Sequence, residues 1–134
     1  MRWVALLALG AWLIAQPLAW ADNAGDVLLR QAYRQHHGDL QIEGEGTVIK
    51  LLADDKRGSR HQRFVIRLQS GQTLLVAHNI DLAAKIDDLK VGDKVAFFGE
   101  YEWSDKGGTL HWTHRDPVGR HVDGWLKHEN KVYQ

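Results

Sequence analysis

Apolar residues recur at every second position through the middle of this chain, and no other feature of the sequence restricts its fold as much. A period of two is typical of a β-strand with one buried face, because successive side chains point to opposite sides. The pattern predicts strands over residues 47–52, 60–68, 73–79, 94–103 and 108 to about 114. The side chains expected to face the core are those of Phe64, Ile66, Leu74, Val76, Val95 and Phe97.

Two helical segments accompany these strands. An amphipathic stripe predicts a helix from Asn23 to His37, and residues 81–89 are expected to form a short helix between the third and fourth strands. This element order is that of an oligonucleotide/oligosaccharide-binding (OB) barrel. We therefore expect an all-β fold with an N-terminal helix, built as a small five-stranded OB-fold-like Greek-key barrel whose fifth strand returns beside the first. A small antiparallel sandwich is the alternative, and a short C-terminal hairpin is expected over 124–133.

The first 21 residues have the pattern of a secretory signal. Arg2 precedes a continuous apolar run, Val4–Ala15, which is too short to span a bilayer comfortably, and Ala19–Ala21 forms a small-x-small cleavage site. Cleavage after Ala21 would leave a single domain over residues 22–134, with no membrane attachment and a periplasmic or secreted location. An uncleaved membrane anchor is the alternative.

Charge and cysteine content restrict the partners of the mature chain. The sequence has 17 Lys and Arg against 17 Asp and Glu, and loss of Arg2 with the signal leaves 16 against 17. A non-specific nucleic-acid binder is normally basic, so nucleic acid is not favoured as a ligand. Because the sequence contains no cysteine, the exported chain has to obtain its stability from packing or from a bound ligand or metal.

Three parts of the sequence together resemble one bacterial family. They are Glu45–Asp55 followed by Gly58–Phe64, then Gly71–Asp81, and finally Gly99–Trp103 with His111–Trp125. These motifs are long and cover nearly all of the chain after the signal. They resemble the secreted family known as domain of unknown function 3465. The resemblance implies a small exported bacterial protein and brings no established activity with it.

The densest group of chemically active side chains lies near the C-terminus, where half of the eight histidines occur from His111 onward. His111 and His114 are three residues apart, so a regular strand directs them to opposite faces. His114, Asp116 and His121 are predicted to meet around the following turn and to hold zinc or another first-row divalent ion. The alternative is that these residues satisfy one another and nearby backbone groups around a buried turn.

Basic side chains mark one edge of the second strand. Arg60, His61 and Arg63 lie on a strand that usually contributes to the ligand face of an OB barrel, where arginine suits phosphate, carboxylate or acidic-sugar groups. A solvated face balanced by acidic residues is the alternative. We expect this edge and the C-terminal cluster to form one site. Its predicted ligand-binding residues are Arg60, His61, Arg63, His78, Asn79, Trp103, His111, Trp112 and Arg120.

Two further features have two interpretations each. His78 is in phase with Leu74 and Val76, so it either enters the core or sits at the barrel mouth. Glu100 and Glu102 share one face of the fourth strand, where they form either an exposed surface or a metal-binding or acid–base pair.

These observations favour a binding module for an anionic or polyhydroxylated ligand, such as nucleic acid, a glycan or an acidic polysaccharide. The alternative is a metal-dependent hydrolase, for example a phosphodiesterase, that uses the C-terminal His/Asp cluster. A third hypothesis is a structural or partner-binding protein in which the polar cluster only stabilises the fold. The sequence has no phosphate-binding glycine loop and no nucleophile elbow, so nothing in it indicates acyl transfer.

Overall fold

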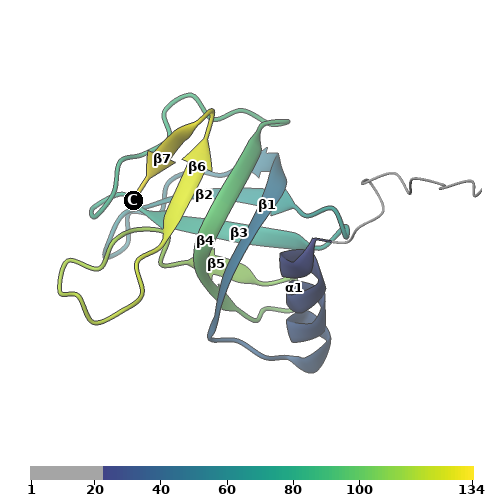
Figure 1. Cartoon of the computed structure of the whole chain (residues 1–134). Helices are drawn as coiled ribbons and strands as arrows, with labels where there is room; N and C mark the ends of the chain where they lie inside the picture. The colour runs from purple at the N-terminus through teal and green to yellow at the C-terminus, as the bar shows by residue number, and fades with distance from the viewer. Residues whose placement is uncertain (1–22) are drawn as a thin grey trace, which may run out of the picture.

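The computed structural model describes residues 23–134 of the chain, and this part contains seven strands and one helix (Figure 1). The predicted signal sequence and its cleavage site lie outside the described residues. Within that range, no helix is long and apolar enough to cross a membrane. The elements are α1 (Ala24–Gln35), β1 (Leu40–Leu51), β2 (His61–Arg67), β3 (Thr73–Asn79), β4 (Lys94–Glu102), β5 (Thr109–His111), β6 (Trp125–His128) and β7 (Lys131–Tyr133).

Five of the strands close into a barrel, which confirms the predicted architecture. The pairing order is β1-β2-β3-β5-β4, and β4 closes the barrel by pairing with β1. These pairs are antiparallel except β3–β5, which is parallel. The expectation that the fifth strand returns beside the first is wrong, because β5 lies between β3 and β4. The predicted C-terminal hairpin forms as β6–β7 and extends the sheet from β4 (Figure 1).

The first strand is longer than expected, because it begins at Leu40 and not at Thr47. Its first half pairs with β4 and its second half with β2. Gly44 and Gly46 occupy inward-facing positions in the first half, so they contribute no apolar side chain to the period-two pattern. A Cβ on Gly44 would lie 2.7 Å from the ring of Phe97. The glycine therefore makes room for a core aromatic ring, and it also hides the strand from sequence analysis.

The segment between β3 and β4 consists of turns, so the predicted helix over residues 81–89 is wrong. The buried side chain of Gln62 donates from Nε2 to the carbonyl of Ile86 (2.8 Å) and accepts from the Ile86 N–H (3.0 Å). These bonds occupy backbone groups that a helix would use, while Ile86 and Leu89 are buried in the core. Tertiary contacts override the local helical pattern here.

The core fills the barrel and includes all six residues predicted to face it, each of which is fully buried. Leu29 and Ala32 of α1 belong to the same cluster. Trp103 packs against the core, donates from Nε1 to the carbonyl of Tyr33 (3.1 Å) and stacks on His36 at 4.2 Å between ring centroids. Trp103 therefore attaches α1 to the barrel.

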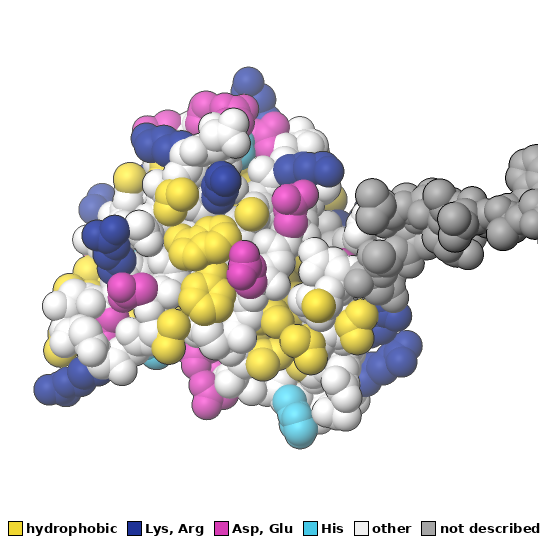
Figure 2. Space-filling model, viewed as in Figure 1, with side chains coloured by type: hydrophobic (Ala, Val, Ile, Leu, Met, Phe, Trp, Pro, Cys, Tyr) yellow, Lys and Arg dark blue, Asp and Glu magenta, His cyan; other side chains and the backbone are white. Residues whose placement is uncertain are grey.

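Hydrophobic side chains also gather on the outer face of β4 and β6 (Figure 2). Phe98 and Trp125 are directly opposite each other across these strands, and their ring centroids are 6.4 Å apart. Cross-strand aromatic pairs of this kind stabilise a sheet. The pair therefore helps to hold the C-terminal hairpin against the barrel.

Candidate metal-binding site

The predicted metal ligands His114, Asp116 and His121 lie in or beside the loop 112–124, but their ligand atoms do not form a group. The carboxylate of Asp116 accepts hydrogen bonds from the backbone N–H groups of Val118 (2.9 Å), Arg120 (2.9 Å) and His121 (2.7 Å). These bonds hold the pKa of Asp116 below its usual value. Asp116 therefore organises the loop around the turn.

His114 is also occupied by its own loop. It is buried, and its Nδ1 lies 2.7 Å from the carbonyl of Arg115. Two groups of at least three potential ligands have atoms within 4.8 Å of one another among residues 23–134, and His114 belongs to neither of them. The first of these groups consists of Glu100, Glu102 and His111.

Glu100 stands at the centre of the first group, on the outer face of β4. Its partner across the β4–β5 pair is His111, so both side chains lie on the same face. One carboxylate oxygen, Oε2, is 3.4 Å from His111 Nε2 and also 3.4 Å from Nε2 of His121, which the loop 112–124 brings over the strand. Glu102 Oε1 is 3.9 Å from the same His111 nitrogen. Two strands and one loop thus place two imidazole nitrogens 3.4 Å from Glu100 Oε2, and Glu102 lies near the imidazole of His111.

The stacking of Trp112 explains the position of His121. The two rings are nearly parallel, at 10°, with centroids 3.8 Å apart. Trp112 has a positive φ of 54°, an uncommon backbone conformation for a large side chain. The turn in the chain at Trp112 therefore places the indole where it supports the imidazole of His121.

Burial determines the electrostatics of this group. It raises the pKa of Glu100, a hydrogen bond with Asp39 acts in the same direction, and the charge of His121 opposes both. Burial also lowers the pKa of His111, against the opposing effect of Glu102. Both shifts disfavour the charged forms. The carboxylate of Glu100 and the imidazole of His111 are therefore poorly compensated in their charged forms.

Two buried polar atoms in this group lack partners within the described part of the chain. His111 Nε2 has no hydrogen-bond partner there, and neither does Gln41 Nε2. Gln41 pairs with Glu100 on the β1 side, opposite His111 on the β5 side. Buried polar atoms are normally satisfied, and these two flank the same carboxylate, that of Glu100.

The basic edge of β2 has other contacts. Arg60 Nε bonds Asp81 at 2.7 Å, and Arg63 donates from Nε and Nη2 to the carbonyl of Ala53 (3.1 and 3.0 Å). His61 Nδ1 lies 2.9 Å from the carbonyl of Ser59. These contacts order the loops that flank β2, and the side chain of Arg60 remains 58% exposed.

Other residues of the predicted ligand site have structural contacts as well. Asn79 accepts from the Asp81 N–H at 2.9 Å, and Arg120 is exposed on the loop 112–124. His78 lies in the core, where its Nδ1 contacts Thr113 Oγ1 (2.7 Å) and its Nε2 contacts the carbonyl of Ala84 (3.0 Å). The structure therefore places His78 in the core and not at the barrel mouth, the two positions that its phase in the sequence allowed.

The structure thus brings together His111, His121 and Trp112 from the predicted set, and adds Glu100, Glu102 and Gln41. The charge of His61 also acts on the pKa of His111, so the β2 edge lies close enough to influence this group. The Glu100/Glu102 pair is recognisable in the sequence, but the sequence does not link it to the histidines. The register that places Glu100 opposite His111 would have supplied the link.

The fold and these side chains define a small OB-barrel protein with a two-histidine, two-carboxylate group on its surface. The sequence model of the family described as "Protein of unknown function (DUF3465)" matches residues 13–134, and the chain belongs to this family. No curated protein matches the chain. The family membership confirms the resemblance found in the sequence.

Proposed function

We propose that this protein is a binding module that holds a first-row divalent metal ion, best matched by zinc, through Glu100, His111 and His121. The observation that carries the proposal is the pair of 3.4 Å distances from one Glu100 oxygen to the two imidazole nitrogens. This spacing is long for a hydrogen bond. Ligands about 2.0–2.1 Å from a tetrahedral zinc are about 3.3–3.4 Å from one another, so Glu100 Oε2 already has the separation of a zinc ligand from each of the two imidazole nitrogens.

The ligand chemistry supports the same ion. Imidazole and carboxylate together suit zinc and its first-row neighbours, and a His₂Glu set is typical of sites that keep a fourth position open. A positive ion would also compensate the buried carboxylate and use the lone pair of His111 Nε2. In this proposal the open position takes an oxygen atom of an anionic or polyhydroxylated ligand, in a periplasmic or secreted protein.

Metal-dependent hydrolysis, for example of a phosphodiester, is a second candidate function. The observation that favours it is Glu102, whose carboxylate lies 3.9 Å from His111 Nε2 and is 46% exposed. A carboxylate beside three other ligands can accept a proton from metal-bound water.

Metal binding is tested directly by titrating the purified, metal-free protein with Zn²⁺ in a calorimeter. Glu100→Gln and His111→Ala should each lower the affinity of this site by more than about 100-fold, because even second-shell partners of a metal contribute 10–100-fold. Glu43→Gln, on the exposed outer face of neighbouring β1, and His37→Ala, an exposed histidine, are matched controls. Unchanged binding in both site variants would refute the proposed ligand set.

Hydrolysis is tested separately with the zinc-loaded protein and a chromogenic phosphodiester. Glu102→Gln should abolish turnover while leaving zinc bound. Turnover that is absent from the zinc-loaded wild-type protein would remove the hydrolase candidate and leave the binding module.

A further inference from the structure

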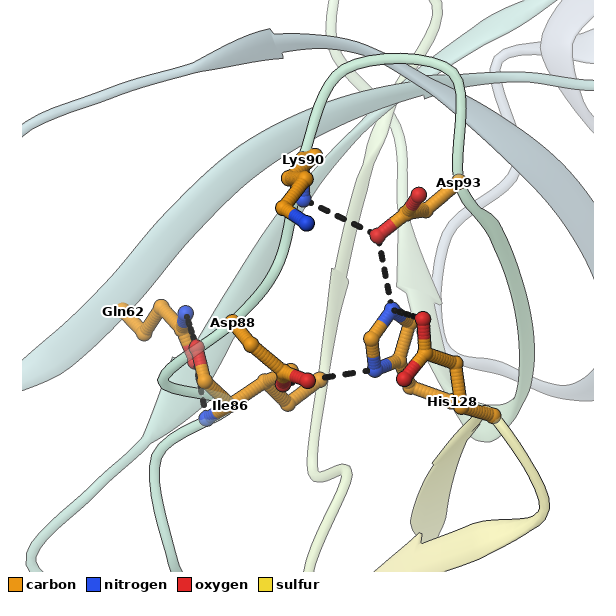
Figure 3. A network of polar contacts seen from close by, with 7 residues as sticks. Gln62, Ile86, Asp88, Lys90, Asp93 and His128 are labelled. Carbon is orange, nitrogen blue, oxygen red and sulfur yellow. Dashed lines mark hydrogen bonds and ion pairs between the residues drawn. The ribbon is translucent and has the colours of Figure 1, made fainter.

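His128 is the most deeply buried histidine outside the core proper, and it lies between the C-terminal hairpin and the segment before β4 (Figure 3). Its side chain is 1% exposed, and its Nε2 is 2.8 Å from Asp93 Oδ2. The same oxygen accepts the backbone N–H of Lys90 at 3.0 Å. The carboxylate oxygen of Asp93 therefore faces two donors, the Lys90 N–H and Nε2–H of His128.

The other ring nitrogen, Nδ1, points toward Asp88, whose Oδ1 is 3.8 Å away (Figure 3). This distance exceeds that of a hydrogen bond. Asp88, His128 and Glu129 each offer a ligand atom, and these atoms lie within 4.8 Å of one another. Glu129 Oε1 lies 3.9 Å from Nε2 of His128, too far for a hydrogen bond. The carboxylates are 62% and 68% exposed and the imidazole is buried. The group therefore has a fixed nitrogen ligand at its base and two acidic groups that open to solvent.

The two lysines near this group are in contact with other residues, so the position between the acidic side chains stays open to a cation. The group borders a cavity of about 290 Å³ that is also lined by Lys85 and Lys131. Lys85 bonds Asp54 at 2.7 Å, and Lys131 Nζ lies over the ring of Tyr133 at 4.9 Å, so both lysines have other partners. Glu129 itself adopts a positive φ of 49° in the β6–β7 turn, a conformation in which a glutamate is uncommon.

We propose a second metal-binding site, in which Asp88, Nδ1 of His128 and Glu129 bind a first-row divalent ion. Asp93 acts as a positioning residue: it holds Nε2–H and thereby directs the lone pair of Nδ1 toward the ion, as carboxylates do behind many metal-bound histidines. The ion would join the β6–β7 turn to the segment before β4. In a chain without cysteine it would supply a cross-link between Asp88 and His128, which are 40 residues apart in sequence.

The test is a Zn²⁺ titration of purified protein, followed by calorimetry and by long-range ¹H–¹⁵N spectra of the imidazoles. The double variant Asp88→Asn/Glu129→Gln should bind one equivalent less than the wild type, and zinc should move the Nδ1 resonance of His128 in the wild type only. Both substituted residues are exposed, so the apo fold should persist, as judged by circular dichroism. Asp105→Asn/Glu43→Gln, at two exposed acidic residues outside this cavity, is the matched control.

The result is distinguishable from that of the Glu100 site. If the wild type binds a single equivalent, and this equivalent survives His111→Ala but disappears in Asp88→Asn/Glu129→Gln, the result supports the His128 site and removes the first site. An equal number of equivalents at unchanged affinity in wild type and double variant overturns the second site. A His128 resonance that does not move with saturating Zn²⁺ overturns it as well.

Discussion

Acidification from pH 7 to pH 4 should destabilise this fold through one buried side chain, His78. Burial lowers the pKa of His78 from 6.5 to about 4, and the nearby His114 and His61 act in the same direction, against the hydrogen bond with the Ala84 carbonyl. The side chain is fully buried, so the neutral form is part of the native structure. Protonation places a charge in the core beside Thr113.

The direction and magnitude of this pH effect follow from the linkage between proton binding and folding. Between pH 6.5 and pH 4 the unfolded chain binds a proton at His78 and the native chain does not, so the free energy of unfolding falls as the pH falls through this window. Each pKa unit corresponds to about 1.4 kcal/mol, so a shift of about 2.5 units contributes about 3 kcal/mol. The contribution is complete above pH 6.5 and lost by about pH 4.

Urea unfolding at pH 4, 5, 6 and 7 measures this effect when the wild type is compared with His78→Gln. Glutamine is neutral throughout and can retain a bond to Thr113, so the variant should lose about 3 kcal/mol less than the wild type between pH 7 and pH 4. Only the difference in pH dependence matters, because the substitution alters overall stability too. If the free energy of unfolding depends on pH to the same extent in both proteins, the assignment to His78 is refuted.

Three other predictions concern the core, the loop and the N-terminus. Phe97→Ala should lower the free energy of unfolding by about 3–5 kcal/mol in urea titrations, because its ring is fully buried against Gly44; a cost near zero would contradict the strand phase. Asp116→Ala should speed amide hydrogen exchange at Val118, Arg120 and His121, whose N–H groups it binds, whereas Asp105→Ala should not. Mass spectrometry of exported protein should find Asp22 as the first residue, and retention of residues 1–21 would contradict the signal prediction.

The strands are predictable from the sequence wherever their side chains carry the period-two signal. Phe64, Ile66, Val76 and Phe97 face the core as expected, because alternation along a strand is a local property that tertiary contacts do not change. The period-two signal misses the first half of β1, where glycines face inward. The sequence pattern also predicts a helix where Gln62 binds the backbone of Ile86.

The candidate site was likewise predictable only in part from the sequence. The sequence alone singled out His111, His121 and Trp112 as unusual neighbours, because they are close together along the chain. It did not show that Glu100 is their partner, since that depends on the register between β4 and β5, and a slip of one residue would turn the carboxylate to the other face. Nor did it show that the neighbouring Asp116 is used by its own loop. Side-chain direction is set by local periodicity, whereas the meeting of ligands from separate strands and a loop is set by pairing and burial, which only the tertiary structure decides.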